Sequence, residues 1–193
     1  AFEGVRMKFN ISKGINFKSL IGRQRIFFTK SDGIVRGLDS EFILNEIFNK
    51  LNFSSNLTIG LSFVSKYEKD NNPKYNLPEN VGAWSSRFLF NLKNWNLEAE
   101  YVSKYNDPSY VNNFIFKKGN AILINTNYSV RGFGINLSAK RIDNMDFRSE
   151  RNESLQNLLI NYLPALTKQQ TYALATIYPY ATITNGEMGL QFD

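Results

Sequence analysis

The chain has 193 residues, 42% of them hydrophobic, a formal net charge of +6, and neither cysteine nor histidine. The lack of cysteine excludes disulfides and thiol chemistry, and the lack of histidine removes the commonest general base and metal ligand. No stretch of about 18 apolar residues occurs, which excludes a membrane-spanning helix. A transmembrane β-barrel remains compatible with the mean hydropathy of −0.34, because only half of the residues in its strands are apolar. The basic residues form no cluster, so we expect no nucleic-acid partner.

Apolar and polar residues alternate along much of the chain, and this two-residue period predicts β-strands with one apolar and one polar face. A short turn is expected at 12–14, another at 29–33 from its Ser-Asp-Gly sequence, and a brief helical turn or loop at 46–56. The predicted strands lie, in chain order, at 2–11, 15–28, 34–45, 57–64, 81–92, 95–105, 120–130, 133–142, 155–163, 170–178 and 187–192.

The clearest of these strands is 95–105, in which Trp95, Leu97, Ala99 and Tyr101 alternate with polar residues. Its length is unusual for a soluble strand but suits a tilted membrane crossing of roughly 9–11 residues.

The connections also alternate in length from residue 57 onwards. Long loops are expected at 67–80, 106–119 and 143–154, and two-residue turns at 93–94 and 131–132. Outer-membrane barrels have this arrangement, with short periplasmic turns and long outer loops. The long loops are therefore candidate contact sites for other outer-membrane proteins.

The two-residue turns predict the register of the strands that they join. The first pairs Phe90 with Leu97 and places Arg87 opposite Glu100, an opposite-charge pair worth about 0.2–1 kcal/mol at mid-strand. Aromatic residues then lie at both rims of the apolar face, as in the two girdles of a membrane barrel. The predicted lipid-facing girdle consists of Trp84, Trp95, Tyr105, Tyr128 and Phe133.

These features predict an all-β fold, an antiparallel up-and-down transmembrane β-barrel of about 10–12 strands that forms a single domain over 1–193. A soluble, lipocalin-like ligand-binding barrel is an alternative, because soluble meander barrels also alternate with a period of two. Bacterial barrels normally have an even number of strands. Because the predicted strands are odd in number, we expect the chain to be an incomplete stretch of a longer barrel.

Several stretches together resemble an outer-membrane β-barrel family of Bacteroidota that has no assigned activity. The resemblance spans nearly the whole chain and implies a location in the outer membrane of a diderm bacterium; it implies no catalytic residue. The stretches are Ile21–Arg25, Gly33–Gly37, Phe63–Tyr67, Asn80–Ala83, Lys140–Ser149, Asn161–Lys168 and Asn185–Leu190.

Two groups of acidic residues are candidate sites. Glu98 and Glu100 have a spacing close to that of glycosidase carboxylates, but we interpret them as wall charges paired with nearby cations. Asp143, Asp146 and Glu150 offer the oxygen ligands that Ca²⁺ prefers, but the interleaved arginines and the lack of an EF-hand-like spacing favour a cluster of ion pairs in the loop. We therefore expect no enzyme activity, no metal site and no cofactor.

The charged face of the predicted strands is the basis for a prediction of function. We expect a channel or transport-like protein with a polar lumen; the alternative is a structural or accessory subunit of an outer-membrane complex, with a filled lumen and loops that bind partners. The predicted lumen-facing charges are Arg6, Lys8, Lys18, Asp39, Glu41, Arg87, Glu98, Glu100, Lys104 and Lys140.

Overall fold

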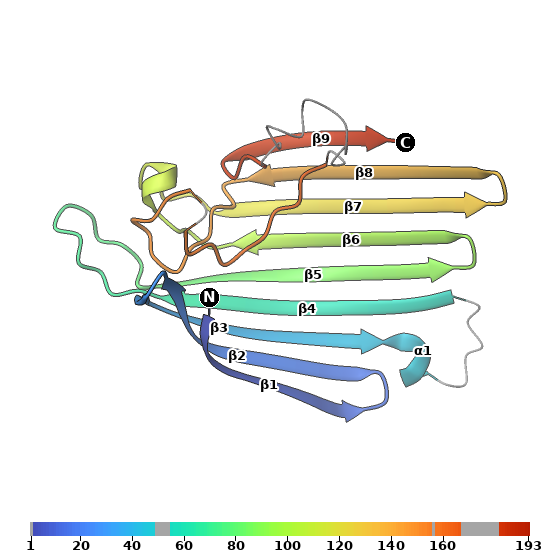
Figure 1. Ribbon diagram of the computed structural model, residues 1–193, viewed down its shortest axis with the longest axis horizontal. Helices are drawn as coiled ribbons and strands as arrows, with labels where there is room; N and C mark the ends of the chain where they lie inside the picture. Colours follow the sequence, from blue (N-terminus) through green and yellow to red (C-terminus); the bar gives the residue numbers. More distant parts are fainter. Residues whose placement is uncertain (1, 49–54, 156, 167–181) are drawn as a thin grey trace.

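The computed structural model describes residues 2–48, 55–155, 157–166 and 182–193. Its described strands form one sheet in which each strand is antiparallel to the next, in the order β1 to β9 (Figure 1). The elements are β1 (Phe2–Ser12), β2 (Ile15–Ile26), β3 (Thr29–Ile43), α1 (Leu44–Ile47), β4 (Ser55–Tyr67), β5 (Asn80–Leu92), β6 (Trp95–Lys104), the 3-10 helix η1 (Tyr110–Asn112), β7 (Gly119–Val130), β8 (Phe133–Asp143) and β9 (Gly186–Phe192).

The all-β prediction is confirmed as a nine-stranded antiparallel meander, but the sheet is open within the described residues. β1 and β9 are its two edge strands and do not pair with each other. No helix in this part of the chain has the length and apolar character needed to cross a bilayer.

The two ends of the sheet differ. At one end, the turn end, tight turns at 13–14, 93–94 and 131–132 join the strands. At the other, the loop end, lie the long connections 68–79 and 105–118 (Figure 1). The registers predicted from the tight turns are confirmed by the pairing of β5 with β6 and of β7 with β8.

The turn expected at 29–33 is wrong. Ile26 pairs with Thr29, so the hairpin turn is Phe27–Phe28, and residues 29–33 belong to β3. Gly33 is instead a point of close approach between two chain segments: a Cβ atom there would lie 2.0 Å from the carbonyl oxygen of Ser149. The glycine that suggested a turn is needed for packing.

The strand expected at 155–163 is also wrong. Its described residues make only an isolated bridge, between Leu159 and Arg148. The Arg148 guanidinium donates to the carbonyl oxygens of Leu155 and Asn157. These backbone groups are therefore satisfied by a side chain and not by the hydrogen bonds of a neighbouring strand. The strand expected at 170–178 lies outside the described residues. The helical turn or loop expected at 46–56 overlaps α1 only at its first two residues; 49–54 lie outside the described residues, and 55–56 belong to β4.

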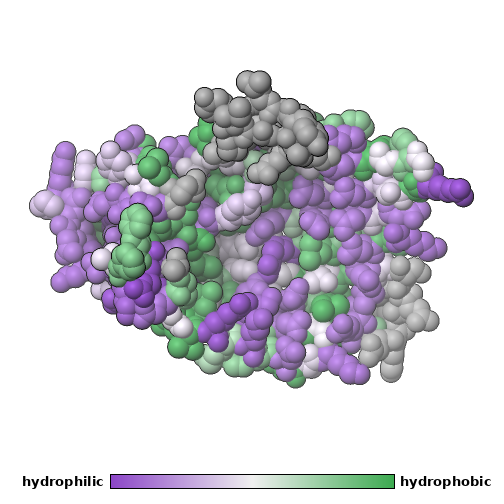
Figure 2. All heavy atoms as spheres, viewed as in Figure 1, coloured by the Kyte–Doolittle hydropathy of each residue, from purple (hydrophilic) through white to green (hydrophobic). Residues whose placement is uncertain are grey.

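The sheet has one apolar and one polar face. The outer face carries Phe63, Phe88, Trp84 and Trp95, which are exposed to different degrees, and the apolar side chains of neighbouring strands continue it. The opposite, inner face carries mainly polar and charged side chains, and rows of hydrophilic residues are visible across it (Figure 2). This division follows from the two-residue period and the register.

Candidate functional site

Residues 144–155 and 157–166, here called the inner segment, lie against the inner face at its loop end and cross it in front of the strands (Figure 1). On the side of β2, Gln24 Nε2 donates to the carbonyl oxygen of Leu159 at 2.7 Å. On the side of β8, Lys140 Nζ donates to the carbonyl oxygen of Pro164 at 3.1 Å. The segment therefore spans the sheet between widely separated strands and covers the loop end of its polar face.

A small apolar cluster seats the inner segment on the sheet. Met145 is buried with Ala121 of β7 and Ile142 of β8, and Val102 and Leu163 pack against them. Burial of a methionine or isoleucine side chain contributes roughly 1.5–3 kcal/mol, so this cluster favours the covered state.

Two lysines that point from the inner face into this covering are entirely buried. Lys66 Nζ of β4 lies 2.8 Å from Asp107 Oδ1, and both side chains are removed from solvent. Lys104 Nζ, at the end of β6, donates to the carbonyl oxygen of Asp146 in the inner segment. A buried charge that loses its partner is strongly destabilising. The Lys104 contact therefore holds the covering in position, and the Lys66–Asp107 pair holds the loop after β6 against the inner face.

A third buried lysine does the same on β8. Lys140 Nζ donates to Thr182 Oγ1 at 2.8 Å as well as to Pro164, and it forms an ion pair with Glu187 of β9. The three lysines thus lie on alternate strands, β4, β6 and β8, which all run towards the loop end.

Arg148 organises the inner segment internally. Its Nε donates to both carboxylate oxygens of Asp146, at 2.8 and 2.9 Å. Its Nη1 and Nη2 donate to the carbonyl oxygens of Asn157 and Leu155 at 2.6 and 2.7 Å. One buried guanidinium therefore satisfies a carboxylate and two backbone groups of the same segment.

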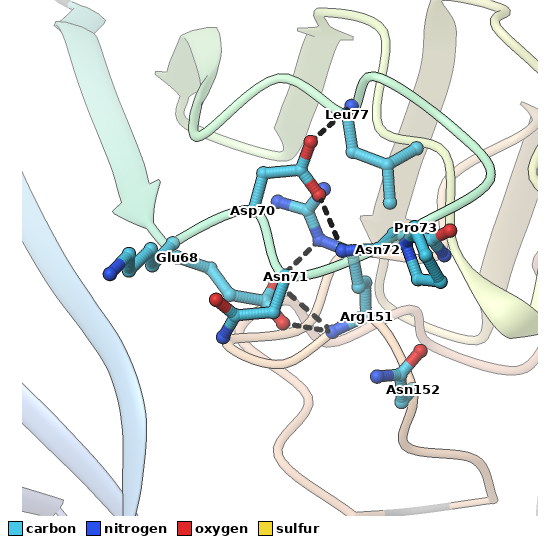
Figure 3. A pocket seen from close by; sticks show the side chains of 9 residues that line it. Glu68, Asp70, Asn71, Asn72, Pro73, Leu77, Arg151 and Asn152 are labelled. Carbon is cyan, nitrogen blue, oxygen red and sulfur yellow. Dashed lines mark hydrogen bonds and ion pairs between the residues drawn. The ribbon is translucent and has the colours of Figure 1, made fainter.

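Arg151 joins the inner segment to the loop after β4. Its Nε donates to Glu68 Oε2 at 2.8 Å, its Nη2 donates to the carbonyl oxygen of Pro78, and its backbone N–H also points at the Glu68 carboxylate (Figure 3). The loop 68–79 is consequently held against the covering.

The same loop is ordered by Asp70. Its carboxylate accepts backbone N–H groups of Asn72 and Leu77, at 3.0 and 2.9 Å (Figure 3). These two hydrogen bonds hold the pKa of Asp70 below its ordinary value, with a smaller contribution from the charge of Arg151. A cavity of about 240 Å³ lies between the loop and Arg151, and polar side chains dominate its lining.

Nearer the turn end, the inner face carries a charged network outside the covering. Asp39 of β3 accepts from Ser62 Oγ at 2.6 Å and from Lys18 Nζ at 3.3 Å. Arg87 of β5 also reaches Asp39, by passing over Gly60 of β4, where a Cβ atom would lie 2.8 Å from Arg87 Nε. The predicted register of Arg87 with Glu100 is confirmed, but the ion pair expected between them is wrong, because Gly60 leaves a path to Asp39.

By register, the charged residues predicted to face a lumen all lie on the inner face, but the structure divides them. Lys104 and Lys140 are buried under the covering. Lys18, Asp39, Glu41 and Arg87 form the network, with Lys18 also 3.9 Å from Glu41. The others, Arg6, Lys8, Glu98 and Glu100, make no ion pair with any residue in the described ranges.

The residues of the predicted girdle lie on the outer face in two groups. Trp84 and Tyr105 lie towards the loop end, whereas Trp95, Tyr128 and Phe133 lie at the turn end, where Trp95 pairs with Tyr128. All five side chains are exposed.

The acidic residues weighed as calcium ligands point in different directions. Asp143 pairs with Lys117, Asp146 with Arg148, and the Glu150 carboxylate accepts the backbone N–H of Asp32. The described residues contain no group of three or more acidic side chains placed to hold a metal ion.

Sequence reasoning missed Lys66, its partner Asp107, and the Glu68–Arg151 contact. One signal was present: Val-Ser-Lys-Tyr occurs at 64–67 and again at 102–105, at the ends of β4 and β6. The repeat places Lys66 and Lys104 in equivalent positions, and both are buried.

Comparison with known proteins gives a family and no function. The model of one family, described as a family of unknown function (DUF6029), matches residues 1–193. No curated protein and no solved structure matches the chain.

Proposed function

Since the chain belongs to this family of unknown function, we propose its role from geometry: a non-enzymatic wall of an outer-membrane β-barrel in a diderm bacterium, closed at the loop end by its own inner segment. In this proposal the protein is a structural or accessory component that presents its loops, rather than an open channel.

One observation carries the membrane part of the proposal. The loop end of the polar face is packed against the inner segment, whereas the apolar face is not covered by any described segment. A soluble barrel or sandwich has the opposite arrangement, because it buries its apolar face and exposes its polar face to water. Bare side chains such as Phe63, Trp84 and Trp95, on strands of 10 to 15 residues in β1 to β8, suit contact with lipid.

Among the described strands, β1 and β9 each have one unpaired edge, and a barrel requires that these edges be paired. Unpaired backbone groups in hydrocarbon cost several kcal/mol each. In the proposal, the two edges pair with each other or with further strands in the membrane.

The buried contacts under the covering support a closed lumen. Lys66, Lys104 and Lys140 all have their ammonium groups withdrawn from solvent, and an open pore would leave such groups in water. The loop 68–79 is fixed to the covering through Arg151, so it forms a defined surface that a partner protein can bind.

The test is conductance of the purified protein in a planar lipid bilayer, with co-purifying proteins identified from mild detergent. We expect the wild-type protein to insert without steady conductance and to retain stoichiometric partners. Arg148→Ala, which frees Asp146 and two carbonyl groups, should produce conductance. Lys117→Gln, which removes an exposed ion pair, is the matched control and should produce no conductance. A protein that stays soluble without detergent would refute the membrane placement.

A channel is the second candidate. It is favoured by the network around Asp39 and by Glu98 and Glu100, which leave charges on the inner face beyond the covering. Salt-dependent conductance of the wild-type protein, without partners, would support the channel instead of the closed wall.

A further inference from the structure

The outer face has a hollow of about 480 Å³ near the loop end, a trough bounded by strands β3 to β6. Register places Arg36, Ser65, Gly82 and Tyr105 in one row across these strands, so two small residues lie between two large ones. The neighbouring row, one step towards the turn end, contains Leu38, Phe63 and Trp84.

The trough is open because Gly82 has no side chain. A Cβ atom at this position would lie 3.0 Å from the ring of Phe63 and 3.7 Å from Tyr105. Leu38, Phe63 and Tyr105 are all substantially exposed, and the lining is mainly apolar. An apolar chain bound in the trough would bury the exposed apolar surface of these three side chains, which is favourable.

Two cations flank the trough at its rim. Arg36 is exposed and donates one hydrogen bond, 2.8 Å long, to Asn80 Oδ1, which holds the guanidinium at the edge of the hollow. No carboxylate in the described ranges lies within ion-pair distance of Arg36. At the same loop-end rim, Lys118 precedes the first residue of β7, and its Nζ lies 6.0 Å from the centre of the Tyr105 ring. An apolar trough with cations at one end matches a molecule that has an acyl chain and an anionic head.

We propose that this trough is a binding site for one anionic membrane lipid, with its phosphate at Arg36 and Lys118 and an acyl chain against Leu38, Phe63 and Gly82. The site rests on the proposed membrane placement, since it faces lipid only if the outer face does. It adds a specific, charge-selective lipid to a surface that otherwise contacts lipid without selectivity.

The two tryptophans of the chain allow a direct test. Trp84 pairs with Phe63 beside the trough, whereas Trp95 lies on the same face at the turn end. In Trp95→Phe the remaining tryptophan is Trp84, so its fluorescence reports on the trough. In Trp84→Phe the remaining tryptophan is Trp95, so its fluorescence reports on the turn end of the outer face. Each variant is reconstituted in vesicles of phosphatidylcholine and phosphatidylglycerol, with bromine on the acyl chains of only one lipid at a time, since brominated chains quench tryptophan on contact.

Quenching of Trp84 should favour phosphatidylglycerol over phosphatidylcholine by roughly 25-fold, about fivefold for each of the two cations near an anionic lipid. In the Trp95→Phe background, Arg36→Gln should remove most of this preference, and Ser65→Leu should remove it by filling the trough. Arg141→Gln, which changes an outer-face arginine of β8 away from the trough, should preserve it.

The possible failures can be told apart. If neither tryptophan is quenched by either brominated lipid, the membrane placement fails. If Trp95 is quenched but Trp84 shows equal quenching by both lipids, or if Arg36→Gln and Arg141→Gln behave alike, the membrane placement stands and the lipid site is overturned.

Discussion

Lys66 and Asp107 form an ion pair of 2.8 Å between β4 and the loop after β6, and neither side chain is open to water. The two residues are far apart in the sequence, and β5 lies between their strands. The pair therefore fastens a loop to the inner face across a strand.

Breaking this pair should be costly. Lys66→Met leaves the Asp107 carboxylate buried with only the Lys104 ammonium, 4.0 Å away, as a cation, so we expect a loss of about 3–5 kcal/mol in the free energy of unfolding, measured by urea denaturation in detergent. Adding Asp107→Leu should restore part of the loss, because both charges of the pair are then gone while Lys104 keeps its hydrogen bond to the Asp146 carbonyl oxygen. Lys117→Gln, at the exposed pair with Asp143, should change stability by at most about 1 kcal/mol. Equal losses in Lys66→Met and Lys117→Gln would contradict a role for burial.

Close packing at Gly33 gives a second prediction. In Gly33→Ala the new methyl group would meet the Ser149 carbonyl oxygen, so β3 and the inner segment must separate. We expect a loss of about 1–3 kcal/mol, as for other overpacked sites, and faster hydrogen exchange at the amide of Ser149.

The matched control for Gly33 is Gly134 of β8, where the nearest atom to a new Cβ would be 3.9 Å away. Gly134→Ala should stay within about 0.5 kcal/mol of the wild type. If Gly33→Ala leaves the exchange at Ser149 unchanged, the contact between β3 and the inner segment is not a constraint.

The strands and their register could be predicted because they depend on local signals. A two-residue period fixes which face each side chain occupies, and the tight turns at 93–94 and 131–132 fix the pairing. The inner segment could not be predicted in this way. Its contacts join Gly33 to Ser149 and Glu68 to Arg151, pairs that no short-range pattern relates.

The charged face shows the same limit. The sequence identified Lys104, Lys140 and Arg87 as residues of one face, but not which of them are buried. Burial depends on which segment covers each residue. For Arg87, the ion-pair partner depends on Gly60 of β4, which has no side chain and lies two strands away from β6, the strand of the expected partner Glu100. A residue's face is a property of its own strand, whereas its partner is a property of the assembled sheet.

Arg87 therefore provides a third prediction, a pair of double-mutant cycles. Arg87→Gln combined with Asp39→Asn should give a coupling energy of about 0.5–1 kcal/mol, since both groups are partly exposed. The cycle of Arg87→Gln with Glu100→Gln should give a coupling near zero, although these residues are directly opposed in the ladder. Unfolding by urea measures both cycles, and a larger coupling with Glu100 would show that Arg87 does not cross β4.

Asp70 provides the fourth prediction, a pH dependence in the loop 68–79. Backbone N–H groups of Asn72 and Leu77 stabilise its charged form and lower its pKa from the ordinary value of 3.8. A group with a lowered pKa contributes stability that is fully present above the unfolded value, and the contribution is lost as the pH falls through the folded value. The order of the loop should thus be constant above pH 3.8 and decrease only at more acid pH.

An NMR titration that follows the Asp70 carboxyl carbon and the Leu77 amide together measures this effect. Both signals should titrate with one midpoint below 3.8, and the carboxyl midpoint should return to about that value when the protein is unfolded in urea. In Asp70→Asn the side chain keeps only one oxygen acceptor, so the Leu77 amide should lose its dependence on this titration and exchange faster at all pH values. A Leu77 amide that still titrates in Asp70→Asn would contradict this prediction, because the effect would not come from Asp70.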